Sequence, residues 1–134
     1  MLLLALTVLA TQAAPAVDFP ALDAAIDRCE RATVLPVFAA EAQRRSAAVT
    51  AFYQEQAQIV AERLATAARR RALREGAAVE AAGATDQQLA LVQLALDDRQ
   101  RALDDQRRLE TMRRDAVDLK REYFLTKCAG KKSD

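Results

Sequence analysis

Histidine and tryptophan are absent from this chain, which has only two cysteines, three glycines, three prolines, two tyrosines and four phenylalanines. Without histidine, the sequence lacks the commonest general base and the usual zinc ligand. Two cysteines alone cannot complete a four-ligand zinc site. The glycines are isolated, so there is no glycine-rich phosphate loop. We therefore expect no enzyme activity, no cofactor and no metal site.

Charge of neither sign dominates. Twenty Lys and Arg residues stand against nineteen Asp and Glu residues, which gives a formal net charge of +1. A nucleic-acid-binding protein usually has a strong basic excess, and an acidic disordered tail has the opposite bias. The balance argues against both classes, and we expect no nucleic-acid partner.

The leading segment, residues 1–16, contains no charged side chain. An apolar run from Leu2 to Ala10 leads into Ala14-Pro15-Ala16, a small-x-small cleavage pattern. The run is too short to cross ~30 Å of hydrocarbon, which argues against an N-terminal anchor. The pattern predicts a Sec-type signal peptide cleaved near Val17, and hence a periplasmic or secreted protein. Its weakness is an n-region whose only positive group is the Met1 amine.

The remaining sequence is typical of helices, because Ala, Leu, Arg and Gln lose little rotamer freedom in a helix. It predicts a single domain over residues 17–130 and a frayed tail at 131–134. Asp18 is placed to cap a first helix, and Pro36 is expected to end or kink it. Helices are predicted at about 20–34, 37–75 and 86–127.

Two long helices joined by the short loop 76–84 should fold back antiparallel. Gly76 is a natural helix stop, and Thr85 with Gln88 forms a capping box before the last helix. A short repeat places Leu96 and Leu103 one heptad apart, which favours packing along a coiled-coil-like seam. The predicted register pairs apolar residues across the hairpin: Phe38 with Tyr123, Ala42 with Leu119, Val49 with Met112, Phe52 with Leu109 and Leu64 with Leu96.

The two cysteines lie near opposite ends of this hairpin. An even cysteine count in an exported protein favours a disulfide, here between Cys29 and Cys128. The pair is one helical turn out of the predicted register, an offset that a kink at Pro36 would absorb. A redox pair or intermolecular bridges are the alternatives. The predicted fold is all-α: a long helical hairpin with a short N-terminal helix, clipped by one disulfide.

One cluster of carboxylates is a candidate for chemistry: Asp97, Asp98, Asp104 and Asp105. Such a cluster can bind calcium or serve as acid and base in glycoside cleavage. The competing interpretation is a solvated helix face, because Arg101 and Arg108 follow the two Asp pairs at i,i+3 and i,i+4 spacing. We favour the solvated face.

Two surface features are candidates for contact. One is the arginine cluster near the hairpin tip: Arg69, Arg70, Arg71 and Arg74. One interpretation is that the cluster contacts an anionic lipid or an acidic partner. The other is that its positive charge stabilises the negative C-terminal end of the helix dipole. The other is aromatic, since Phe52 and Tyr123 fit the inner seam while their neighbours Tyr53 and Phe124 should face outward.

The segment from Arg121 to Cys128 resembles the closing segment of lysozyme-inhibitor-like helical domains, which also tie early and late cysteines. The likeness covers residues 121–128 and lacks the further cysteines and aromatic-rich stretch of those domains. The first functional hypothesis is a non-enzymatic interaction protein of the bacterial periplasm or cell envelope with a protein partner, as a monomer or homodimer. A holdase-like chaperone or a lysozyme-inhibitor-like protein is the second. An enzyme using the aspartate cluster is the third.

Overall fold

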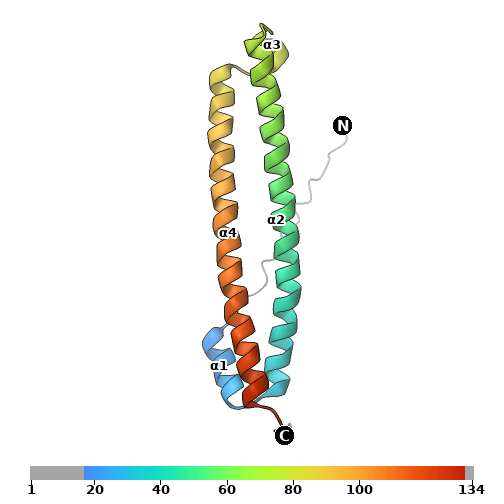
Figure 1. The fold of residues 1–134 in the computed structure, drawn as a ribbon, viewed down its shortest axis with the longest axis vertical. Helices are drawn as coiled ribbons and strands as arrows, with labels where there is room; N and C mark the ends of the chain where they lie inside the picture. The colour runs from blue at the N-terminus through green and yellow to red at the C-terminus, as the bar shows by residue number, and fades with distance from the viewer. Residues whose placement is uncertain (1–16, 132–134) are drawn as a thin grey trace, which may run out of the picture.

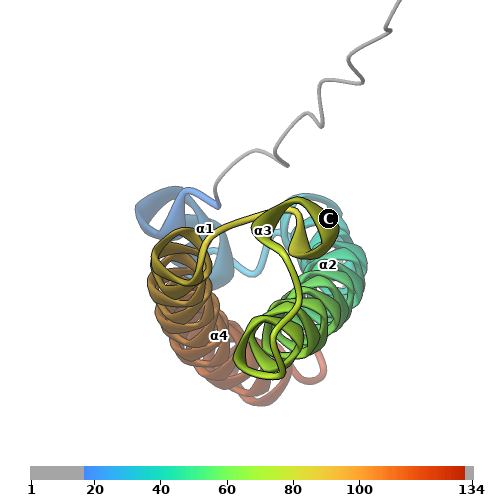
Figure 2. The same ribbon diagram turned by 90° about the horizontal axis from the view of Figure 1, so that it is seen from above.

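The computed structural model describes residues 17–131, which form a rod of two long antiparallel helices (Figure 1). The elements are α1 (Phe19–Asp27), α2 (Arg31–Arg74), α3 (Val79–Ala82) and α4 (Asp86–Lys127). The helices α2 and α4 make up the rod, α1 lies beside them at one end, and α3 lies at the other end. Seen along the rod, α2 and α4 wind around a common axis, as a seven-residue repeat requires (Figure 2). The described residues contain no strand, so the predicted all-α hairpin is confirmed.

Two predictions fall partly or wholly outside the described residues. The proposed signal peptide at 1–16 lies outside them, as does most of the tail at 131–134. Within residues 17–131, no helix combines the length and apolar character that a membrane span requires.

The turn between the first two helices is earlier than the sequence suggested. Asp18 caps α1 as predicted, accepting a 3.1 Å hydrogen bond from the Ala21 amide. However, α1 ends at Asp27, and Cys29 takes the left-handed conformation (φ 54°) that usually favours glycine after a helix. The expected break at Pro36 is wrong, since Pro36 lies inside α2. Pro36 is the sixth residue of α2 and lacks the N–H that would donate to the carbonyl of residue 32, but α2 continues through it.

At the far end of the rod, the predicted helix stop and capping box are confirmed. Gly76 follows the end of α2 with a φ of 94°, and its amide donates to the Leu73 carbonyl. The predicted loop contains one additional helical turn, α3. The capping box is complete: Thr85 Oγ1 accepts from the Gln88 amide at 3.1 Å, and Gln88 Oε1 accepts from the Thr85 amide at 2.9 Å.

The main hydrophobic core lies at the end of the rod where α1 packs against α2 and α4. Its buried members are Leu22, Ala25, Ile26, Val34, Phe124 and Cys128. The predicted disulfide joins Cys29 to Cys128, with their Cα atoms 5.6 Å apart. It forms although α2 does not end at Pro36.

Along the rod, the predicted heptad is confirmed but the predicted register is wrong. Leu96 and Leu103 are both buried. The same seven-residue spacing continues through other buried residues of α4, namely Leu89, Val117 and Phe124. In contrast, large apolar residues assigned to the seam are exposed: Val49, Leu64, Leu109, Met112, Leu119 and Tyr123. The apolar part of the seam between α2 and α4 is narrow, because polar and charged side chains occupy much of the seam.

Candidate interaction surface

A charged layer crosses the seam in the half of the rod nearer the disulfide. It consists of Glu41 and Arg44 from α2 and of Glu110 and Arg113 from α4. Arg44 donates to both Glu110 oxygens, at 2.8 and 2.6 Å, while Arg113 donates to both oxygens of Glu41. Arg44 also donates to Glu41 at 3.1 Å. The Glu41 side chain is only 6% exposed, so this layer is fixed in place.

The protonation of the charged layer follows from its contacts. Burial alone raises the pKa of Glu41, but the hydrogen bonds from Arg113 and Arg44 outweigh it and lower that pKa below its ordinary value. The hydrogen bond to Glu110 raises the pKa of Arg44. Both contacts therefore favour the charged forms of Glu41 and Arg44, and the layer forms two complementary pairs.

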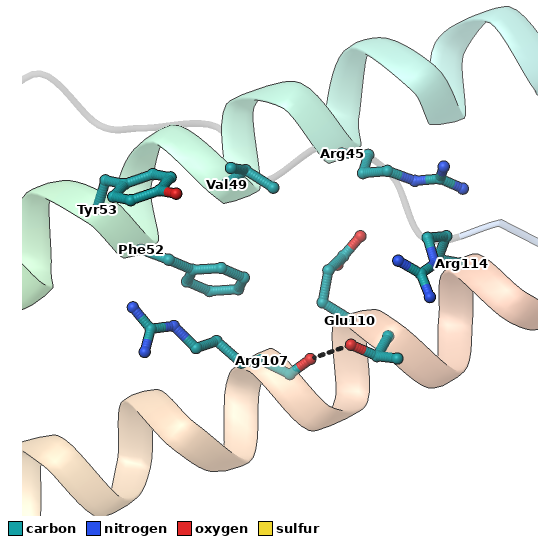
Figure 3. A pocket seen from close by; sticks show the side chains of 8 residues that line it. Arg45, Val49, Phe52, Tyr53, Arg107, Glu110 and Arg114 are labelled. Carbon is teal, nitrogen blue, oxygen red and sulfur yellow. Dashed lines mark hydrogen bonds between the residues drawn. The ribbon is translucent and has the colours of Figure 1, made fainter.

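A groove lies beside this layer, between α2 and α4 (Figure 3). Its volume is about 450 Å³, and its lining residues are Arg45, Val49, Phe52, Tyr53, Arg107, Glu110, Thr111 and Arg114. Figure 3 shows Arg45 and Arg114 together at one end and Arg107 below the Phe52 ring. The groove is lined by arginines as well as by aromatic rings. Each of these arginines lies within 4 Å of a carboxylate: Arg45 of Asp118, Arg107 of Asp104 and Arg114 of Asp115. Glu110 belongs to both the groove and the charged layer. Its contacts with Arg44 hold it in place in the groove wall.

The aromatic predictions have mixed outcomes. Tyr53 is 73% exposed and its neighbour Phe52 is half-buried, as predicted. At the other pair the prediction is reversed: Phe124 is buried and Tyr123 is 52% exposed. The Phe124 ring packs 6.1 Å from that of Phe38, and Arg31 lies over it. Phe124 is therefore a core residue and cannot serve as a contact residue.

Eight of the exposed apolar residues form two stripes, and all of them except Tyr53 were predicted to face the seam. The α2 stripe comprises Val49, Tyr53, Val60 and Leu64, at spacings of 4, 7 and 4. The α4 stripe comprises Leu109, Met112, Leu119 and Tyr123, at spacings of 3, 7 and 4, with half-buried Ala116 between them. Such spacings keep each set on one side of its helix. Scattered exposed apolar residues are ordinary, whereas a heptad-spaced stripe on a stable helix is a candidate contact surface.

The arginine cluster at the tip is partly engaged within the chain. Arg70 is half-buried and donates to Asp86 at 2.9 Å, and this contact lowers the pKa of Asp86. Arg74 donates to the Arg70 carbonyl, in keeping with the helix-end interpretation. Arg69 and Arg71 are exposed. Contact of this cluster with anionic lipid stays a prediction.

The aspartate cluster forms ion pairs with arginines. Asp98 pairs with Arg101, and Asp105 pairs with Arg108, both at the predicted i,i+3 spacing. Asp97 reaches across to Arg63 on α2 at 2.8 Å. Asp104 accepts from Gln100 and lies 3.7 Å from Arg107. Within residues 17–131, no three side chains of the kind that bind metals come together. This geometry agrees with the solvated face.

No protein-family model matches the chain, and comparison with curated proteins and with solved structures found no significant similarity.

Proposed function

We propose that this protein is a non-enzymatic interaction protein of the bacterial cell envelope that docks a protein partner on the side of α2. The observation that carries the proposal is that the α2 stripe runs into the arginine-lined groove. Val49 and Tyr53 belong to both. A partner segment with apolar side chains for this stripe would fit both features if its carboxylates replaced Asp104 and Asp115 beside Arg107 and Arg114.

A stable frame supports this role. Binding a partner on a rigid surface costs less conformational entropy than ordering a mobile one. The disulfide holds one end of the hairpin together, and the charged layer fixes Glu110 beside the groove. Tyrosine at the rim suits a contact residue, because its large ring carries a polar hydroxyl.

The compartment is part of the proposal. Disulfides form and persist in the periplasm and outside the cell. The Cys29–Cys128 bond therefore agrees with the export that the leading segment predicts. Intact mass measurement of the protein from its native host tests this directly. A chain beginning near Val17 with an oxidised pair supports export, whereas an uncleaved, reduced chain contradicts it.

The docking site can be tested by site-specific photo-crosslinking in living cells. A photoreactive phenylalanine analogue replaces Tyr53, and mass spectrometry identifies the trapped proteins. The control carries the same analogue at Gln58, an exposed α2 residue about 140° around the helix from position 53. We expect one recurring envelope protein at position 53 and not at position 58. Equal labelling at both positions, or none at position 53, would contradict the proposed site.

A holdase-like chaperone is the second candidate, favoured by the exposure of large apolar side chains on both long helices. Leu64 is 68% exposed, and Met112 and Leu119 are each 67% exposed. Such a protein should slow the aggregation of unrelated unfolding clients at stoichiometric ratios. In the crosslinking experiment it would trap many different envelope proteins instead of one.

A further inference from the structure

The α4 stripe is complementary to itself when two copies of the helix run in opposite directions. Ala116 lies at the centre of the stripe. With a two-fold axis at Ala116, Leu109 meets Tyr123 of the second copy, and Met112 meets Leu119. Every large apolar residue of the stripe then finds an apolar partner, as an isologous interface requires.

Charge selects this antiparallel direction. Between the stripe and the hairpin tip, Asp98 and Asp105 lie on the same side of α4 as the stripe. Both are exposed. In a parallel dimer each aspartate would face the same aspartate of the second copy, and this like-charge contact is destabilising. In the antiparallel dimer Asp98 lies beyond the end of the partner helix. Asp105 comes opposite Lys127 of the second copy, a contact of opposite charges beside the pairs that they form with Arg108 and Asp27 within each copy.

The flanks of the stripe agree with the same direction. On one flank, Arg108 of each copy comes opposite Glu122 of the other, and both side chains are exposed in the monomer. On the other flank, Arg113 and Lys120 would approach each other. Their charges are already balanced within each copy, since Arg113 binds Glu41 and Lys120 binds Asp23.

We infer that the protein forms an antiparallel homodimer through the α4 stripe, with Ala116 at the two-fold axis. The paired stretch from Leu109 to Tyr123 is ~22 Å long at 1.5 Å per residue. Such an interface is small, so we expect weak dimerisation, with a dissociation constant on the order of micromolar. It leaves the α2 stripe uncovered, and each dimer therefore presents two copies of the docking side proposed above.

Sedimentation velocity over a series of micromolar concentrations tests the dimer. Leu119→Glu places a charge in two layers of the interface and should weaken dimerisation by ~10-fold or more. The matched control is Leu64→Glu on α2, because Leu64 is 68% and Leu119 67% exposed. Circular dichroism should show both variants folded, since neither side chain is buried in the monomer. A monomer at every concentration, or a dimer broken by Leu64→Glu alone, would overturn the inference.

Crosslinking with a short bismaleimide tests the direction. The native disulfide stays oxidised, and single cysteines are introduced as Leu109→Cys or Tyr123→Cys. A mixture of the two proteins should crosslink efficiently, whereas each protein alone should not. Self-crosslinking of Leu109→Cys would show a parallel or different dimer and overturn the proposed geometry. These readouts use purified protein, so their failure is distinguishable from failure of the Tyr53 docking site.

Discussion

Arg113 of α4 binds both carboxylate oxygens of Glu41 of α2, although the two residues are 72 positions apart in the chain. This pair and its neighbour, Arg44 with Glu110, replace apolar residues in the seam of the hairpin. Buried ion pairs contribute little net stability, but each partner depends on the other because an unpaired buried charge is costly. The charged layer therefore selects which residues of α2 and α4 face each other.

The first prediction concerns this pair. Glu41→Ala leaves Arg113 without its carboxylate and should lower the free energy of unfolding by ~3 kcal/mol. Replacing both residues, as Glu41→Leu with Arg113→Leu, should cost less than Glu41→Ala alone. Urea denaturation measures both changes. Arg101→Ala is the control, since the Arg101 and Asp98 side chains are 72% and 74% exposed and its effect should stay within ~0.5 kcal/mol. A larger loss in the double variant would contradict the interpretation.

The second prediction concerns the disulfide. Cys29 and Cys128 are separated by 99 positions, and closing so long a loop restricts the unfolded chain. Reduction should lower the free energy of unfolding by ~4–5 kcal/mol in the chain-entropy model. Urea denaturation with and without reductant tests this. The double variant Cys29→Ser and Cys128→Ser should be insensitive to reductant, and an equal midpoint for oxidised and reduced wild type would rule out a stabilising role.

The third prediction is a loss of stability in acid. Burial raises the pKa of Glu41, but the hydrogen bonds from Arg113 and Arg44 lower it by more than burial raises it. The folded-state pKa of Glu41 therefore lies below the ordinary value. The contact with Arg99 similarly lowers the pKa of Glu55. A carboxylate with a lowered pKa stabilises fully above its unfolded pKa of about 4.3, and this stabilisation is lost as the pH falls through the folded-state pKa.

Urea midpoints measured from neutral pH downward should therefore stay level and then fall below about pH 4.5. Glu41→Gln should show a lower midpoint at neutral pH and a shallower acid decline. An acid decline as steep in Glu41→Gln as in the wild type would assign the pH dependence to other carboxylates.

The fourth prediction contrasts two adjacent aromatic residues. Phe124 is 1% exposed in the main core, whereas Tyr123 is 52% exposed. Phe124→Ala should lower the free energy of unfolding by ~3–5 kcal/mol, because it removes a buried ring and leaves a cavity. Tyr123→Ala should cost much less in the monomer. Thermal and urea denaturation at low protein concentration tests both, and equal losses would mean that the two residues share the burial.

Local structure was predictable because its causes are local. The caps at Asp18 and Thr85 and the stop at Gly76 depend on side chains and backbone within a few residues. Pro36 misled the prediction, since α2 begins five residues before it and tolerates a proline inside the helix. The true break is centred on Cys29, a residue type with no intrinsic preference for the left-handed conformation it adopts.

The sequence by itself determined the helical hairpin, its heptad repeat at Leu96 and Leu103, and the pairing of its two cysteines. These follow from helix propensity, seven-residue spacing and cysteine count, all of which can be read along the chain. Only the tertiary structure decided which side of each long helix faces the other. Apolar residues occur on several sides of α2 and α4, so apolar pattern alone allows several registers. The pairing of Glu41 and Arg44 with Arg113 and Glu110 selects one register and leaves the two apolar stripes exposed.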